Sequence, residues 1–278
     1  MLERRIIGIY TQYCNAELEK VIDAAKRFFQ EHDIETTSLE NILQGQKAEA
    51  ILSLGGDGCV LNSARSVAHK KIPVLGVNFG HIGYLCSAES NELLKALQAL
   101  ADRQYTIETR TMLHCDVYQG KGKVWESEAL NEFLVGGSNR TVSLEITIND
   151  QKFANIRSDG ILLSTSTGST AHSFSAGGPI LTTDNNFCLL AINPIFSIIK
   201  SLILDTTSVV SMRNLSNYAF PFVVADGQRD FQLKENMLAK LRQSDYKANL
   251  IQLGNRQPIL HLHNSLQRLI ARELNGQH

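Results

Sequence analysis

The sequence predicts an α/β N-terminal domain with a parallel, Rossmann-like sheet, then a β-rich, β-sandwich-like C-terminal domain and a C-terminal helix that returns to the first domain. Strand-like and helix-like segments alternate up to residue 105, which is typical of βαβ units. Strand-like runs separated by turn signals then follow one another up to residue 255. The 278 residues are enough for about two domains. We therefore expect one domain over 1–105, with 256–278 packing back on it, and a second over 106–255.

Apolar spacing predicts the elements of the first domain. The apolar residues of Glu17–His32, and those of the segment that follows Val60, recur at helical spacing. Short apolar runs between these helices are typical of buried parallel strands. Ser90 is the expected N-cap of a helix that carries the leucines of Leu93–Leu100. The expected strands are Ile6–Tyr10, Ala50–Leu54 and Pro73–Val77.

The second domain is predicted from short strands and turns. Gly120-Lys121-Gly122, Asn149-Asp150 and Asp226-Gly227 are turn signals between apolar runs. The expected strands are Leu113–Tyr118, Val124–Ser127, Leu144–Ile148, Ile161–Ser164 and Ala219–Val224. Ile259–Leu274 has helical spacing again, which predicts the returning C-terminal helix.

Composition excludes several classes of protein. The formal net charge of −1 argues against a nucleic-acid partner or an anionic membrane surface. No apolar run approaches the length that crosses a bilayer, and the N-terminus does not read as a signal peptide, so we expect a cytoplasmic protein. The five cysteines are scattered without a Cys-x-x-Cys pair, and we interpret them as reduced thiols packed as small hydrophobes.

The first segment with chemical significance is Gly55-Gly56-Asp57-Gly58, where a buried strand ends and a helix begins. Glycines let the backbone approach a ligand closely, and a helix N-terminus offers free N–H groups to phosphate. A carboxylate repels phosphate, so Asp57 suits a hydroxyl, a proton or a metal instead. The alternative is a glycine-rich turn with Asp57 as a helix cap. The standard glycine-rich nucleotide-binding loops are absent.

The second segment, Asn78–Leu85, follows the next expected strand, so its glycines should lie at the same carboxyl edge of the sheet. His81 in this segment is either a catalytic base or merely a polar loop residue.

Two further segments lie in the second domain. Asn131-Glu132 is uninformative by itself. The run Thr165–Pro179 consists mostly of Ser, Thr, Gly and Ala, and it follows Arg157-Ser158-Asp159-Gly160. So many hydroxyls and small side chains beside a strand suit a polar ligand held by close backbone contacts.

Together these segments resemble the NAD kinases. The resemblance depends on their order and spacing over most of the chain. Gly-Gly-Asp-Gly alone is shared with lipid kinases and phosphofructokinases, whereas Asn131-Glu132 and Thr167-Gly168-Ser169-Thr170-Ala171 at these spacings are specific to NAD kinases. The resemblance implies transfer of the γ-phosphoryl group of ATP to the adenosine 2′-hydroxyl of NAD, with a divalent metal ion such as Mg²⁺. It also implies a homodimer or homotetramer.

The resemblance also implies roles for individual residues. Asp57 matches the general base, and Gly55, Gly56 and Gly58 match the phosphate loop, with Gly58 also near NAD. Asn131 and Glu132 match the pair that grips the adenosine end. The remaining residues expected to bind NAD, partly from a neighbouring subunit, are Arg157, Asp159, Thr170, Ala171, His172, Ser173, Phe174, Ser175 and, as a weaker match, Gln228. No metal ligand is assigned.

Some positions depart from the family pattern. His172 stands where Tyr is common, Ser166 where Pro is common, and Cys59 where Thr or Asn is usual; Phe196–Ile203 replaces a segment with His and Arg-Pro. Ser166 in place of Pro should loosen its loop. Two alternatives therefore stay open: a non-catalytic sensor that binds NAD or NADP, and a lipid kinase of the Gly-Gly-Asp-Gly superfamily.

Overall fold

The computed structural model describes residues 4–13, 15–80, 82–137, 140–195, 201–254 and 267. The chain divides into two compact units. The first consists of the residues up to Thr109 together with the chain from Ala248 on, and the second is Arg110–Lys247. Except for Gln267, the C-terminal helix expected over 259–274 lies outside the described residues.

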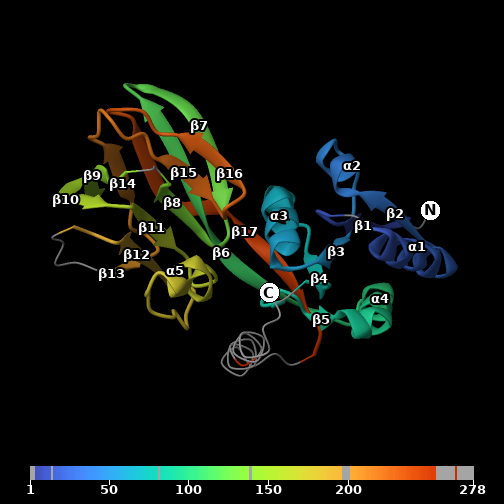
Figure 1. Cartoon of the computed structure of the whole chain (residues 1–278). Helices are drawn as coiled ribbons and strands as arrows, with labels where there is room; N and C mark the ends of the chain where they lie inside the picture. Colours follow the sequence, from blue (N-terminus) through green and yellow to red (C-terminus); the bar gives the residue numbers. More distant parts are fainter. Residues whose placement is uncertain are drawn as a thin grey trace. The chain divides into compact units, whose positions relative to one another are not determined.

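The first unit contains a parallel sheet. Its elements are β1 (Arg5–Tyr10), α1 (Ala16–Glu31), β2 (Ile34–Ser38), α2 (Leu39–Leu43), β3 (Ala50–Gly55), α3 (Asp57–Val67), η1 (Ala68–Lys70), β4 (Val74–Asn78), β5 (Ala88–Glu89), η2 (Ser90–Glu92), α4 (Leu93–Asp102), the start of β6 (Thr106–Gln119) and the end of β17 (Leu238–Gln252). The strands lie in the order β17-β4-β3-β1-β2 with β5 beside β4, and each pairs with its neighbour in parallel. The α/β architecture predicted for this region is therefore confirmed (Figure 1).

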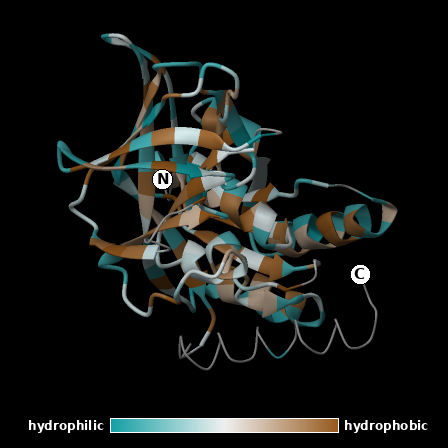
Figure 2. Cartoon of the chain, turned by 60° about the vertical axis from the view of Figure 1, so that its left-hand side comes forward, coloured by the Kyte–Doolittle hydropathy of each residue, from teal (hydrophilic) through white to brown (hydrophobic). Residues whose placement is uncertain are grey.

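Helices cover both faces of this sheet. Successive residues of a strand point to opposite faces, so neighbouring residues of β1 contact different helices. Ile7 and Ile9 of β1 pack into the apolar cluster that includes Phe29 of α1 and Leu97 of α4. A Cβ on the intervening Gly8 would lie only 2.6 Å from Ile42 of α2 on the opposite face. Figure 2 shows the matching stripes of apolar and polar residues along the helices.

β2 and α2 are not predicted from the sequence, and the cap predicted near α4 is wrong. β2 is an edge strand whose sequence, Ile-Glu-Thr-Thr-Ser, has one fully apolar residue and hence no apolar run. Ser90 is not the cap. Glu89 instead forms a capping box with Glu92 around η2, and the Glu89 N–H donates to Glu92 Oε2 at 3.2 Å.

The second unit is built of antiparallel strands. After β6 come β7 (Gly122–Ala129), β8 (Glu132–Gly136), β9 (Val142–Ile148), β10 (Gln151–Ser158), β11 (Gly160–Ser164), η3 (Gly168–Thr170), α5 (His172–Ser175), β12 (Asn186–Ile192), β13 (Ser201–Asp205), β14 (Val210–Asn214), β15 (Phe222–Ala225), β16 (Arg229–Gln232) and most of β17. A six-stranded sheet has the order β13-β12-β11-β8-β15-β16, and a second series of pairings runs β10-β9-β14-β17. The predicted β-rich character is therefore confirmed.

One apolar cluster of the second unit includes residues of both sets of strands, among them Phe133 and Phe187 from the six-stranded sheet and Leu144, Met212 and Leu241 from the other.

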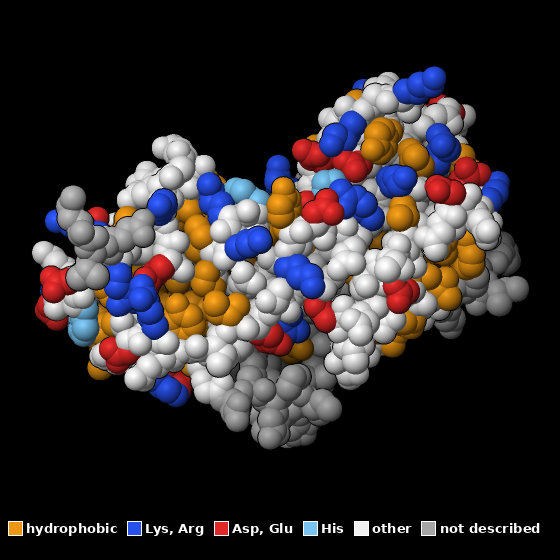
Figure 3. All heavy atoms as spheres, turned by 180° about the vertical axis from the view of Figure 1, so that it is seen from behind, with side chains coloured by type: hydrophobic (Ala, Val, Ile, Leu, Met, Phe, Trp, Pro, Cys, Tyr) orange, Lys and Arg blue, Asp and Glu red, His pale blue; other side chains and the backbone are white. Residues whose placement is uncertain are grey.

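Four of the five cysteines, in both units, are buried, as expected of cysteines packed as small hydrophobes: Cys59, Cys86, Cys115 and Cys188. On the face seen in Figure 3, acidic and basic side chains are interspersed, in keeping with the small net charge. Among the described residues, no helix is long and apolar enough to span a membrane.

Candidate active site

The glycine-rich loops of the first unit lie together at the carboxyl ends of two neighbouring parallel strands. β3 and β4 pair so that Gly55 lies opposite Asn78, and the Phe79 N–H donates to the Gly55 carbonyl at 3.1 Å. A Cβ on Gly80 would lie 2.8 Å from the Gly56 Cα, so the two loops touch backbone to backbone. Ligands of open α/β sheets bind at this edge. The prediction that both loops lie at the same carboxyl edge is confirmed.

Asp57 is fixed by the second of these loops. It is the first residue of α3, and the N-cap is Gly56, which has no capping side chain. The Asp57 carboxylate accepts hydrogen bonds from the Tyr84 N–H at 3.0 Å and from the Leu85 N–H at 2.6 Å. The alternative interpretation of Asp57 as a helix cap is therefore wrong. The two bonds hold a carboxylate at the N-terminal end of a helix.

A cavity of about 720 Å³ opens beside this loop in the first unit. Its lining includes Gly55, Gly56, Gly58, Cys59, Asn78, Phe79, Gly80, Glu89, Ser90 and the segment after β1, namely Thr11, Gln12, Tyr13, Asn15, Glu17 and Leu18. The residues after β1 were not predicted from the sequence. The signal was available, because β1 is a parallel strand whose carboxyl end must lie at the same edge.

Cys59, which stands where Thr or Asn is usual in the family that the sequence resembles, lines this cavity. Its sulfur accepts a hydrogen bond from the Gln12 N–H at 3.4 Å, and a Cβ on Gly55 would lie 2.3 Å from that sulfur. Burial raises the pKa of the Cys59 thiol, which keeps it neutral and uncharged beside the phosphate-type loop. Cys59 therefore acts as a packing residue that links the loop after β1 to the glycine loop.

In the second unit, Asp226 holds the peptide that carries Asn131 and Glu132. The Asp226 carboxylate accepts N–H groups from Leu130 at 3.0 Å, Asn131 at 2.8 Å and Glu132 at 3.2 Å. The Asp226 N–H in turn donates to the Glu132 carbonyl at 3.0 Å. The turn signal at Asp226-Gly227 was recognised in the sequence, but this use of its carboxylate was not.

The hydroxyl-rich segment holds the same peptide from its carbonyl side. The Thr165 hydroxyl donates to the Leu130 carbonyl at 2.7 Å, and the Thr165 N–H donates to the Asn131 carbonyl at 2.9 Å. A Cβ on Gly168 would lie 2.2 Å from the Asn131 carbonyl oxygen, so only glycine fits there. The structure thus brings Asn131-Glu132 and the start of the Thr165–Pro179 run together.

Some side-chain polar atoms around Asn131-Glu132 have no hydrogen-bond partner among the described residues. Asn131 Oδ1, Glu132 Oε2 and Thr167 Oγ1 are buried and have no hydrogen-bond partner within the part of the chain that the structure describes. Burial, and then the nearby Asp226 carboxylate, raise the pKa of Glu132 to about 8. Glu132 therefore carries a proton near neutral pH and can donate as well as accept a hydrogen bond. Unsatisfied buried polar atoms of this kind are typical of a binding site.

Replacing Glu132 by Gln should change how stability depends on pH. Because the folded-state pKa is raised, the native protein binds more protons than the unfolded chain between about pH 4.5 and pH 8. The wild type should therefore lose stability as pH rises through that window, by at most about 1.4 kcal/mol per pH unit from this group. Glu132→Gln should lose this slope, as measured by urea unfolding at several pH values. Equal slopes for the two proteins would contradict a protonated Glu132.

The other predicted residues of the second unit differ in exposure. Arg157, Asp159, His172, Phe174 and Ser175 are exposed, Thr170, Ala171 and Gln228 are half-buried, and Ser173 is buried. The Asp159 carboxylate accepts a hydrogen bond from the Asn193 amide at 2.9 Å, and His172–Ser175 form α5.

Three other positions were singled out in the sequence. His81 and 196–200 lie outside the described residues. Ser166, expected to loosen its loop, is buried, and its hydroxyl donates to Asp184, whose other oxygen accepts the Thr111 N–H at 2.7 Å.

These features define a class of protein: an α/β protein with a phosphate-type glycine loop at the carboxyl edge of its sheet, joined to a β-rich unit with a buried polar cluster. Two family models match the chain, "ATP-NAD kinase N-terminal domain" over residues 10–105 and "ATP-NAD kinase C-terminal domain" over residues 130–253. The chain belongs to the NAD kinase family and is a phosphotransferase. The lipid-kinase alternative is thereby excluded.

Curated relatives and solved structures agree with this assignment. The NAD kinase of Natranaerobius thermophilus is 31% identical over 91% of this chain and 94% of its own. An NAD kinase of Clostridium botulinum is 33% identical over 92% and 88%. An NAD kinase from Archaeoglobus fulgidus in complex with ATP has a TM-score of 0.75 at 20% identity, over 95% of this chain and 99% of that one. Yeast NADH kinase complexed with NADH has a TM-score of 0.83 at 19% identity, over 95% and 87%.

Proposed function

We propose that this NAD kinase transfers the γ-phosphoryl group of ATP to the adenosine 2′-hydroxyl of NAD, with Asp57 as the general base. The hydroxyl oxygen attacks the γ-phosphorus, its proton passes to the Asp57 carboxylate, and ADP leaves. The observation that carries this proposal is the Asp57 carboxylate itself, held by the Tyr84 and Leu85 N–H groups at the start of α3. A hydroxyl is a weak nucleophile, so a fixed proton acceptor assists its attack.

The remaining roles follow the chemistry of each group. Gly55, Gly56 and Gly58 have no side chain and would let phosphate approach the backbone of the loop closely, and Gly58 would also contact NAD. Asn131 and protonated Glu132 would hydrogen-bond the adenosine end of NAD. Arg157 suits a pyrophosphate, because a guanidinium binds phosphate oxygens in pairs. The other residues that we propose to hold NAD are Asp159, Thr170, Ala171, His172, Ser173, Phe174, Ser175 and Gln228.

The side-chain oxygens in the cavity of the first unit suit a divalent cation such as Mg²⁺. Glu89, whose Oε2 accepts the Asn78 amide at 3.0 Å, lines the same cavity as the glycine loop, so a carboxylate of the kind that Mg²⁺ prefers lies in that cavity. Mg²⁺ bound with ATP supplies neutralisation of the phosphate charge. Glu89 is the side chain that we propose to face it, directly or through water.

We also propose a homodimer or homotetramer in the cytoplasm, without a nucleic-acid or membrane partner, in which 1–105 binds nucleotide and 106–255 binds NAD and self-associates. Leu215, Tyr218 and Phe220 of the second unit are exposed large apolar side chains, which are typical of a surface that another subunit covers. Light scattering measures the assembly.

The test of the reaction is NADP formation by the purified protein with NAD, ATP and Mg²⁺. NADP and ADP should form in equal amounts. Binding of NAD in a titration without any product, whatever the phosphoryl donor or divalent metal, would instead make the chain a dinucleotide sensor, the alternative that the altered segment Phe196–Ile203 keeps open.

Asn131→Ala should weaken NAD binding without unfolding the protein. The backbone of residue 131 is held by Asp226 and Thr165, whereas its side-chain oxygen has no partner among the described residues, so truncation spares the fold. Loss of a hydrogen bond of about 1–1.5 kcal/mol corresponds to roughly a tenfold rise in KM for NAD with a smaller change in kcat. Asn155→Ala on the exposed side of β10 is the control. An unchanged KM would remove Asn131 from the site.

A further inference from the structure

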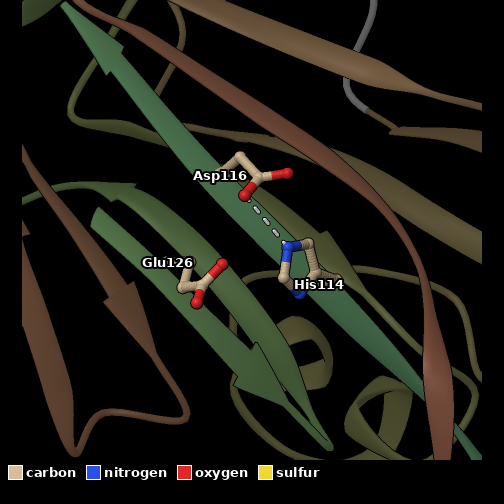
Figure 4. Close-up of side chains that lie close together, drawn as sticks. All are labelled: His114, Asp116 and Glu126. Carbon is tan, nitrogen blue, oxygen red and sulfur yellow. Dashed lines mark ion pairs between the residues drawn. The ribbon is translucent and has the colours of Figure 1, made fainter. Parts of the chain in front are cut away.

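The β6–β7 hairpin of the second unit carries a group of ligand-type side chains that the kinase reaction does not use. His114 and Asp116 are two residues apart on β6, and their register partners on β7 are Glu128 and Glu126. Because side chains alternate along a strand, all of them lie on one face of the hairpin. The ligand atoms of His114, Asp116 and Glu126 lie within 4.8 Å of one another (Figure 4).

The hairpin holds three of these four groups in a partly buried setting, whereas the Glu126 side chain is 58% exposed. The side chains of His114, Asp116 and Glu128 are only 12%, 13% and 20% exposed. His114 Nδ1 lies 2.7 Å from Glu128 Oε1, which orients the ring and turns Nε2 toward Asp116. His114 Nε2 and Asp116 Oδ1 are 3.2 Å apart. With a proton on Nδ1 these two atoms are both electron-pair donors, so a cation between them is favourable.

The charge of the group also favours a cation. Three carboxylates, those of Asp116, Glu126 and Glu128, belong to this group, and Lys123 pairs with two of them: Lys123 Nζ lies 3.2 Å from Asp116 Oδ1 and 2.5 Å from Glu126 Oε2. Glu128 Oε2 is buried with no hydrogen-bond partner in the described chain. Lys123 is 47% exposed, so its flexible side chain can leave the two carboxylates that it bridges.

We propose that His114 Nε2, Asp116 and Glu126 form a binding site for a divalent transition-metal ion of the Zn²⁺ type, in which Glu128 orients His114 and Lys123 competes with the metal. One imidazole nitrogen with two carboxylates is a donor set for Zn²⁺ and its neighbours rather than for Mg²⁺. Two ligand atoms at about 2.1 Å from a tetrahedral Zn²⁺ lie about 3.4 Å apart. The 3.2 Å between His114 Nε2 and Asp116 Oδ1 is close to that separation.

This site shares no residue with the glycine loop or with the Asn131-Glu132 cluster, and the proposal does not depend on the proposed reaction. Its residues lie on two adjacent strands joined by a short turn, and the register between them is regular from Leu113 to Val117. A bound metal would therefore cross-link β6 and β7 and stabilise the hairpin.

Calorimetric titration of the full chain with ZnCl₂, and separately with MgCl₂, tests the proposal. We expect saturable binding of a single equivalent of Zn²⁺ and much weaker binding of Mg²⁺. Asp116→Asn and His114→Gln should each weaken Zn²⁺ binding by about tenfold or more, and Glu128→Gln by about tenfold. His32→Gln, which removes an exposed histidine from the end of α1, is the matched control and should leave binding unchanged. Thermal unfolding without metal shows that each variant folds.

Lys123→Met separates this site from adventitious surface binding, because removing the competing ammonium should tighten Zn²⁺ binding several-fold. Co²⁺ titration provides a second readout, since a low-symmetry nitrogen and oxygen site gives visible absorption bands that Asp116→Asn should abolish. Two results would overturn the proposal: no saturable Zn²⁺ binding to the wild type, or binding that Asp116→Asn and His114→Gln leave intact. The group would then be an ion-pair cluster centred on a protonated His114.

Discussion

Asp57→Asn is expected to lower kcat by about 10²–10⁴-fold while NAD binding stays within a few-fold of wild type. The substitution preserves the shape of the side chain but removes the group that takes the proton from the 2′-hydroxyl. One amide oxygen can still accept the Tyr84 or the Leu85 N–H, so the loop should keep its conformation apart from one lost hydrogen bond. Steady-state kinetics and an NAD titration on the same preparation separate the two effects.

The control for this prediction is Asp23→Asn, which removes an exposed carboxylate from α1 at a position that is 70% exposed. Its kcat and its thermal stability should equal those of the wild type. Near-wild-type turnover of Asp57→Asn would refute the role of general base, and Asp57 would then be a residue that only positions the loop 80–85. Loss of both NAD binding and turnover would also indicate that Asp57 positions the loop rather than acts as the base.

The sequence predicted those parts of the fold that leave a regular apolar pattern. Apolar patterns predicted five elements within a few residues. The strands β1, β3 and β4 are short apolar runs, and the helices α1 and α3 each bury one apolar face. β2 escaped because an edge strand with polar residues leaves no such pattern. β8 escaped because it begins at Glu132, whose charge disguises a strand that is buried throughout most of its length.

The candidate site divides in the same way. Asp57 and Asn131-Glu132 were found because their motifs are contiguous in the chain. The contacts that position them come from distant residues: the N–H groups of residues 84 and 85 for Asp57, and Asp226 for residues 130–132. Nothing local marks Asp226, because Asp-Gly is an ordinary hairpin turn, and its backbone has the positive φ of 50° that such a turn requires. Long-range hydrogen bonds of this kind are invisible to local patterns.

Asp226→Ala is expected to destabilise the protein by about 2–4 kcal/mol and to raise KM for NAD. The substitution removes the acceptor of three backbone N–H groups, those of Leu130, Asn131 and Glu132, in a region where all three residues are buried. An unsatisfied buried group costs about 1–3 kcal/mol, and water that enters the space left by the carboxylate offsets part of the sum. Urea unfolding measures the loss, and Asp230→Ala on exposed β16 is the control.

Asp226→Asn distinguishes a positioning role from a merely structural one. The amide keeps the shape and one acceptor, so the loss of stability should be smaller than in Asp226→Ala. The negative charge is gone, however, and the charge of Asp226 is the second cause, after burial, of the raised pKa of Glu132. The pKa of Glu132 should therefore fall, and the loss of stability between pH 4.5 and pH 8 should become shallower than in the wild type. If Asp226→Asn kept both the wild-type KM for NAD and the wild-type pH dependence, Asp226 would only tie the hairpin turn to β8. If both changed together, the carboxylate would set the geometry and the protonation of the pair that grips the dinucleotide.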